Sequence, residues 1–92
     1  MLVMIVERVP TSLRGALSRW LLEPKTGTYM GNPSARVRDE LWAKAVKAAG
    51  KEGSIIQVWT SNSPQGFSYR QHGRSEREFV DFEGLALIKK NL

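Results

Sequence analysis

The chain has 92 residues with no cysteine and 1 histidine, so it is one small domain without disulfides, thiolate metal sites or a histidine-rich zinc site. Its 14 lysine and arginine residues against 9 aspartate and glutamate residues give a formal net charge of +5. Such an excess favours a polyanionic partner such as nucleic acid, although in many small basic proteins it serves solubility alone.

The chain begins with a continuous apolar run that predicts a buried strand over Leu2–Val6. This run is too short to span a membrane, and it lacks the basic region and cleavage site of a secretion signal. We therefore expect a cytoplasmic protein with no membrane partner.

Two helices with a short strand between them are expected next. The first helix begins near Thr11, carries an apolar stripe over residues 13–21 and ends by Pro24. A β-prone stretch bracketed by glycine predicts a short strand over 27–31. The second helix is capped by Ser34 and ends at Gly50.

The second half of the chain predicts a β-hairpin and a final strand. Residues 54–60 and 67–72 have strand composition and flank a turn-rich linker. After a polar segment over 73–78, Leu85–Ile88 predicts a C-terminal strand. The element order predicts an α+β, ferredoxin-like βαββαβ fold with an extra C-terminal strand. The free sheet edge of so small a domain predicts a homodimer, because a second chain can cover it.

One acidic residue, Glu7, stands where the first predicted strand ends. Two copies of Glu7 across a dimer axis could hold Mg²⁺, because hard cations prefer carboxylate oxygens. A surface ion pair with Arg8 or Arg14 is the ordinary alternative. His72 has no acid or nucleophile beside it in the sequence that would make it a general base.

Several arginines occupy helix-start, polar-face or loop positions from which a guanidinium group can reach phosphate oxygens. They are Arg14, Arg19, Arg36, Arg38, Arg74 and Arg77. Asp39 and Glu40 could instead neutralise Arg36 and Arg38 locally.

The three tryptophans could stack on bases, as they do in proteins that bind single strands. Trp20 and Trp42 lie in or beside apolar helical stripes, so we expect them to pack in the core or at an interface. Trp59 lies on a predicted strand, and its role is left open.

A series of short motifs in a distinctive order covers nearly the whole chain. The motifs are Leu2–Glu7, Pro10, Leu13–Gly15, Trp20–Glu23, Gly27–Gly31, Ser34–Arg38, Trp42, Thr60–Asn62, Gly66–Phe67 and Val80–Leu85. Together they resemble CRISPR-associated protein 2 of type I-E systems. The resemblance implies a dimeric ferredoxin-like scaffold for spacer acquisition that holds double-stranded protospacer DNA between dimers of the integrase subunit, CRISPR-associated protein 1.

The resemblance also implies roles for particular residues. Arg14 and Arg77 match positions that contact the DNA backbone in the family, and Arg36 and Arg38 lie in a matching basic region. Ser12 and Glu76 replace residues that are often basic in relatives, so Arg74 or Lys25 could compensate.

Glu7 aligns with the acidic position from which metal-dependent nuclease activity was proposed for the family. That position is usually aspartate, so the longer side chain argues against nuclease chemistry here. The integration chemistry is then expected to belong to the partner. The alternative function is a magnesium-dependent endonuclease, acting on RNA or DNA through a metal-bound water between two copies of Glu7. A toxin-like ribonuclease of similar architecture is a third reading.

We expect residues 1–78 to form the ferredoxin-like, DNA-binding dimer domain. Residues 79–92 are expected to form a C-terminal strand segment that takes part in the dimer contact and docks the integrase partner. Leu85, Leu87 and Ile88 are the expected partner-binding residues, because an apolar terminal strand can add to a partner's sheet. Proline at Leu87 is predicted to weaken this docking.

Overall fold

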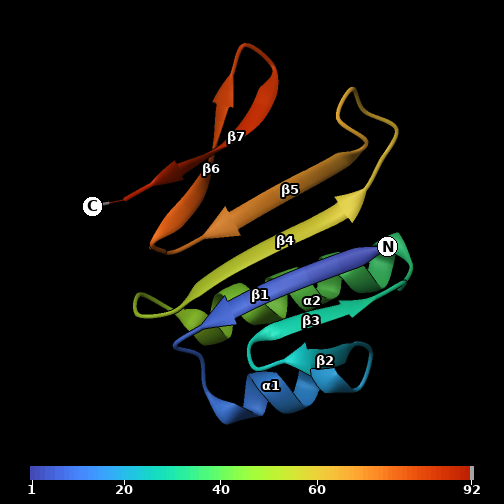
Figure 1. Cartoon of the computed structure of the whole chain (residues 1–92). Coiled ribbons are helices and arrows are strands. Elements are labelled where there is room, and N and C mark those ends of the chain that lie inside the picture. Colours follow the sequence, from blue (N-terminus) through green and yellow to red (C-terminus); the bar gives the residue numbers. More distant parts are fainter. Residues whose placement is uncertain (92) are drawn as a thin grey trace.

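The structure is a computed structural model that describes residues 1–91, which form two helices and seven strands (Figure 1). The elements are β1 (Leu2–Glu7), α1 (Thr11–Ser18), β2 (Leu22–Lys25), β3 (Thr28–Gly31), α2 (Ala35–Ala49), β4 (Ser54–Thr60), β5 (Phe67–His72), β6 (Arg77–Phe82) and β7 (Leu85–Lys90). Five strands form one antiparallel sheet in the order β2-β3-β1-β4-β5, and β6 and β7 form a separate hairpin.

The first four strands and the two helices confirm the ferredoxin-like α+β prediction. Alternate residues of β1, namely Leu2, Met4 and Val6, point to one face of the sheet and are buried. They share one core with Leu13 and Leu17 of α1, and with Leu41, Ala45 and Ala49 of α2. Both helices therefore cover the same face, and β5 widens the sheet by pairing with β4.

The second helix and the central hairpin form where the sequence predicts them. The Ser34 hydroxyl oxygen accepts a hydrogen bond of 3.2 Å from the Val37 N–H, which satisfies a free donor at the start of α2. Gly50 ends the helix with φ of 56°, a left-handed conformation that suits glycine. Strands β4 and β5 have the predicted bounds and pair in register from Ile55–His72 to Thr60–Phe67.

The predicted first helix is too long. In the structure, α1 ends at Ser18, and residues 22–25 form β2, which pairs with β3. Pro24 is tolerated there because β2 is an edge strand, where a missing N–H need not break a ladder. Trp20 leaves the helical stripe and is 58% exposed, so the prediction that it packs in the core is wrong; an interface role for it stays a prediction. Trp42 does pack against the core.

The C-terminal strand exists, but it pairs with a strand that the sequence did not predict. Residues 77–82, which include part of the predicted polar connection, form β6. This strand pairs with β7 in register from Arg77–Lys90 to Phe82–Leu85. The expected division of the chain between residues 78 and 79 therefore falls inside β6.

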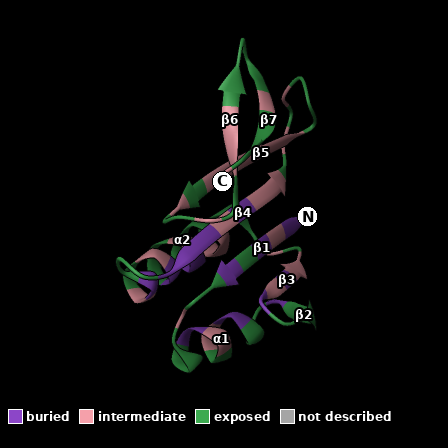
Figure 2. Ribbon diagram, turned by 60° about the vertical axis from the view of Figure 1, so that its left-hand side comes forward, coloured by how far each residue is buried: buried purple, intermediate pink, exposed green. Residues whose placement is uncertain are grey.

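The centre of the sheet face opposite the helices is apolar. Val3 and Ile5 of β1 lie on it beside Met30 of β3 and Ile56 and Val58 of β4. Ile5 is 39% exposed, and purple buried segments alternate with pink and green ones along β1 in Figure 2. We call these five residues the open sheet face. Separately, no helix among residues 1–91 has the length and apolar character needed to cross a membrane.

Candidate nucleic-acid interface

Basic side chains from three segments gather at the end of the sheet where β1 finishes. Strand β1 ends beside the start of β4, and β5 ends there too, because Glu7 pairs with Ser54 and Ile55 with His72. Only three residues separate the end of β1 from the start of α1, so helix α1 begins at the same end (Figure 1). This end therefore carries four arginines, which we call the basic end: Arg8, Arg14, Arg74 and Arg77.

Arg14 is held in place at the basic end by a carboxylate. Its guanidinium donates to Glu23 Oε2 at 3.3 Å, and the Arg14 side chain is still 32% exposed. The Gly27 N–H donates to the same oxygen at 2.9 Å. This backbone hydrogen bond, with Arg14 adding to the effect, lowers the pKa of the Glu23 carboxyl below its ordinary value. Arg14 is thus positioned by an ionised partner that also offsets part of its charge.

Arg74 and Arg77 are exposed, and Arg77 stands opposite Lys90 across the β6–β7 ladder. A groove of about 670 Å³ runs along this part of the hairpin. Its lining residues are Arg74, Ser75, Glu76, Glu78, Lys89, Lys90 and Asn91. Lys90 therefore extends the basic end along the hairpin, whereas Lys89 stands opposite Glu78. The adjacent pair Lys89-Lys90 is visible in the sequence, but only the pairing of β6 with β7 places Lys90 beside Arg77.

Arg36 and Arg38 lie at the opposite end of the sheet. Helix α2 begins after β3, whose last residue, Gly31, pairs with Leu2 at the start of β1. The Arg36 guanidinium donates to Glu40 at 3.2 Å, and that of Arg38 donates to Asp39 at 3.1 Å. The local neutralisation considered from the sequence is confirmed for both arginines.

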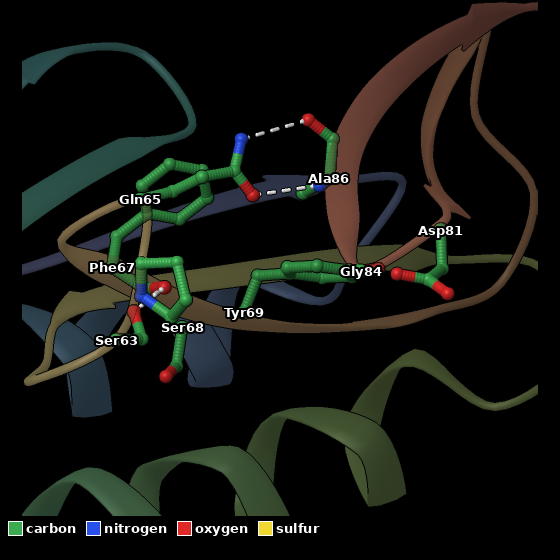
Figure 3. Close-up of a pocket in the computed structure, with 9 residues that line it drawn as sticks. Ser63, Gln65, Phe67, Ser68, Tyr69, Asp81, Gly84 and Ala86 are labelled. Atoms are coloured by element: carbon green, nitrogen blue, oxygen red, sulfur yellow. Dashed lines mark hydrogen bonds between the residues drawn. The ribbon is translucent and has the colours of Figure 1, made fainter.

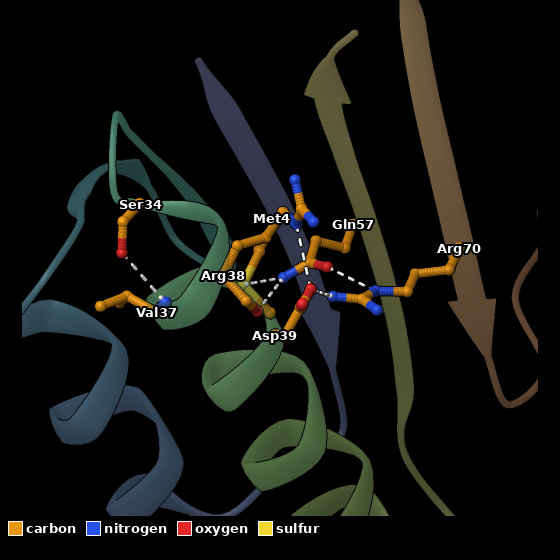
Figure 4. Close-up of polar contacts among 7 residues, drawn as sticks. All are labelled: Met4, Ser34, Val37, Arg38, Asp39, Gln57 and Arg70. Carbon is orange, nitrogen blue, oxygen red and sulfur yellow. Dashed lines mark hydrogen bonds and ion pairs between the residues drawn. The ribbon is translucent and has the colours of Figure 1, made fainter.

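A polar cluster around Asp39 joins α2 to β4 and β5 (Figure 4). The Arg70 guanidinium donates to Asp39 at 2.7 Å and to the side-chain oxygen of Gln57 at 2.7 Å. Gln57 is fully buried and donates to the Arg38 carbonyl oxygen at 3.0 Å. Hydrogen bonds from Arg70 and then Arg38 lower the pKa of the Asp39 carboxyl. Arg70, absent from the predicted site residues, is therefore a structural arginine.

The same cluster accounts for Trp59. The Arg38 guanidinium carbon lies 4.3 Å from the centre of the Trp59 ring, and that of Arg70 lies 5.1 Å from it. These are cation–π distances. Arg70 also lies 5.0 Å from the Trp42 ring. Arginines of the same chain thus already lie over both tryptophan rings, which disfavours the stacking of bases on these rings.

Glu7 lies at the basic end, with serine hydroxyls as its neighbours. Ser54 Oγ donates to Glu7 Oε1 at 3.2 Å, and Ser75 Oγ donates to the same oxygen at 3.1 Å. Within residues 1–91, no three histidine, cysteine, aspartate or glutamate side chains come close enough together to hold a metal ion. A single chain therefore offers Mg²⁺ one carboxylate here, and its other ligands would have to come from a second copy of Glu7, substrate phosphates or water.

The arginines considered as ion-pair partners of Glu7 bind other groups. Arg8 donates to the carbonyl oxygens of Glu52 at 2.9 Å and Arg74 at 2.6 Å, and Arg14 binds Glu23. The His72 ring lies 2.9 Å from the Gly50 carbonyl oxygen, so it is tied to the backbone.

The predicted partner-binding residues are exposed, but they divide between the two faces of the hairpin. Leu85 and Leu87 are 47% and 46% exposed and share the outer face with Val80 and Phe82, their partners across the ladder. Ile88 is 56% exposed and lies on the other face, opposite Phe79. We call Val80, Phe82, Leu85 and Leu87 the outer hairpin face.

The backbone of the hairpin also has a defined orientation. The Asn91 N–H donates to the Glu76 carbonyl oxygen at 2.7 Å, so this pair is hydrogen-bonded. Since bonded and non-bonded pairs alternate in an antiparallel ladder, the Leu87 N–H points inward to β6 and the Ile88 N–H points outward. Proline at Leu87 would thus break the hairpin itself, and Ile88 is the position that tests strand addition.

The fold and the arginine distribution define a small basic protein of the ferredoxin-like α+β class. The family model described as CRISPR-associated protein (Cas_Cas2CT1978) matches residues 1–87. Because this match covers nearly the whole chain, the protein belongs to this family of CRISPR-associated proteins. The resemblance to CRISPR-associated protein 2 is thereby confirmed at the level of the family.

Proposed function

We propose that the protein is the dimeric scaffold of a CRISPR spacer-acquisition complex of type I-E, which holds double-stranded DNA and bridges copies of the integrase subunit, CRISPR-associated protein 1. The observation that carries the DNA-binding part is the basic end. Arginines from the β1–α1 segment and from the start of β6 lie at the same end of the sheet, and guanidinium groups suit phosphate oxygens. Such contacts read the backbone and not the base sequence.

The open sheet face supports the homodimer. Its residues are apolar and belong to the three adjacent strands β3, β1 and β4. Burying such a face against a second copy removes apolar surface from water. Two-fold symmetry also places a basic end and a hairpin on each side of the dimer, as bridging two partners requires.

The hairpin supports docking of the integrase subunit. The outer hairpin face supplies apolar contacts, and the outward N–H and C=O groups of Ile88 provide a free strand edge.

In a pull-down with the integrase subunit, Ile88→Pro is expected to lower the affinity about tenfold or more, because proline removes an outward donor. Ile88→Ala is the matched control, because it truncates the side chain but keeps the N–H. Sizing and circular dichroism check that both variants fold. Equal binding by the two variants would rule out strand addition through β7.

The nuclease alternative depends on Glu7. Glu7→Gln keeps an oxygen for the Ser54 and Ser75 hydroxyls but removes the charge that a metal requires. We expect spacer integration by the full complex to stay within about twofold of the wild type, since the scaffold draws on Glu7 only for these hydrogen bonds. The measurement is integration of a labelled duplex in Mg²⁺. Loss of integration by a folded, dimeric Glu7→Gln protein would favour a catalytic role.

A further inference from the structure

The β6–β7 hairpin shares no backbone ladder with the five-stranded sheet, so side chains must hold it. Two glutamines make paired contacts with it. Gln71 of β5 accepts from the Phe79 N–H at 2.9 Å and donates to the Phe79 carbonyl oxygen at 2.8 Å. Gln65 accepts from the Ala86 N–H at 2.7 Å and donates to its carbonyl oxygen at 3.2 Å (Figure 3).

These contacts fall on the outer edges of the hairpin. Phe79 belongs to β6 and Ala86 to β7, and both stand at non-bonded positions of the ladder, where N–H and C=O point away from the other strand. A side-chain amide has the same donor and acceptor pair as a backbone peptide. Each glutamine therefore binds an edge of the hairpin as a neighbouring strand would, one on each side.

Apolar packing between the hairpin and the sheet is concentrated at Phe79. Its ring stacks on Tyr69 with centroids 4.2 Å apart and lies 6.3 Å from the Phe67 ring. A cavity of about 260 Å³ lies between the β4–β5 loop and the hairpin beside these rings. Away from Phe79 the packing is thus incomplete, and the Gln65–Ala86 pair spans the loosely packed side (Figure 3).

We propose that Gln65 and Gln71 are positioning residues that fix the angle of the β6–β7 hairpin to the sheet. Two attachment points on opposite edges restrain rotation about the aromatic contacts of Phe79. The outer hairpin face and the part of the β7 edge at Ile88, beyond the Gln65–Ala86 contact, are then presented in one orientation. The consequence for partner binding rests on the proposed docking of the integrase subunit, but the attachment is measurable without a partner.

The direct readout is amide hydrogen exchange followed by NMR at Phe79 and Ala86. In Gln65→Ala/Gln71→Ala we expect protection of these two amides to fall about tenfold or more, since each loses its acceptor. The Val80 and Leu87 amides, which bond within the hairpin, should change less. Asn62→Ala, which removes an exposed amide from the β4–β5 loop, is the matched control. Unchanged protection of Phe79 and Ala86 would overturn the proposal.

A second variant tests the chemistry of the pair. Gln71→Glu places a carboxylate against the Phe79 carbonyl oxygen at neutral pH, so protection of the Phe79 amide should fall. Below about pH 4, the protonated carboxyl again offers one donor and one acceptor, and protection should return. Protection that is independent of pH in Gln71→Glu would contradict the paired contact.

Binding of the integrase subunit to the double variant separates the two proposals. Weaker binding together with lost amide protection supports both. Lost protection with unchanged binding would leave the glutamine contacts established and would count against docking through the hairpin.

Discussion

The variant Ile5→Asp is expected to be a folded monomer under conditions in which the wild-type protein is a dimer. Ile5 lies on the open sheet face and is already 39% exposed in the single chain, so a carboxylate there stays hydrated when the chain is alone. In the proposed dimer, two copies of this carboxylate would be buried against apolar residues. Burying an unpaired charge costs several kcal/mol, enough to lower dimer affinity by a factor of at least about a hundred.

Light scattering at micromolar concentration measures this effect directly as a halved mass. Ile5→Thr is the control, because threonine keeps the β-branch and adds no charge. Circular dichroism should show that both variants keep the sheet and helices. A dimeric Ile5→Asp protein, or a monomeric wild-type protein, would show that the open sheet face is not the dimer interface.

The elements that the sequence predicts well are those with strong local signals. Helix α2 has a capping serine and a terminal glycine, and β4 and β5 flank a linker rich in turn residues. The predicted first helix runs too far toward β2 because the apolar pattern and the pairing of strands favour different structures there. An apolar stripe continues through Leu21, which is buried, but the chain has already left the helix after Ser18. Tertiary pairing with β3 decided the outcome, and no local pattern reports it.

Strand β6 was missed because its composition is mixed. Arg77, Glu78 and Asp81 interrupt the apolar residues, and a hairpin that stands apart from the main sheet buries little surface. Without β6, the register of β7 is undefined. The sequence therefore does not show that the Leu87 N–H points inward and the Ile88 N–H outward, since a shift of one residue exchanges inward and outward backbone groups.

The arginines could be counted from the sequence but not sorted by their place in the fold. Arg8 was considered only as a partner of Glu7, although it binds the carbonyl oxygens of Glu52 and Arg74. Arg36 and Arg38 were grouped with Arg14 and Arg77, yet the sheet places the two pairs at opposite ends. Spatial grouping depends on strand pairing between distant segments, which charge and spacing do not determine.

We expect the basic end to supply the phosphate contacts that bind duplex DNA. For each protomer that contacts the duplex, Arg14→Ala/Arg77→Ala should reduce the slope of log affinity against log salt by about 2, because each lost phosphate contact removes roughly 0.9 from the slope. Affinity at low salt should fall by about a hundredfold, and the loss should be similar for duplexes of unrelated sequence. Fluorescence anisotropy with a labelled duplex, repeated over a series of salt concentrations, measures both quantities.

Arg36→Ala/Arg38→Ala is the matched control, because it removes the same formal charge from the opposite end of the sheet. Arg36 and Arg38 lie away from the basic end, where we expect the duplex to bind, so their removal should change the slope by less than about 0.5. This contrast distinguishes a defined interface from a general effect of net charge, which would weaken both double variants equally. Equal slopes in the two variants, or an unchanged slope in Arg14→Ala/Arg77→Ala, would show that the basic end is not where the duplex binds.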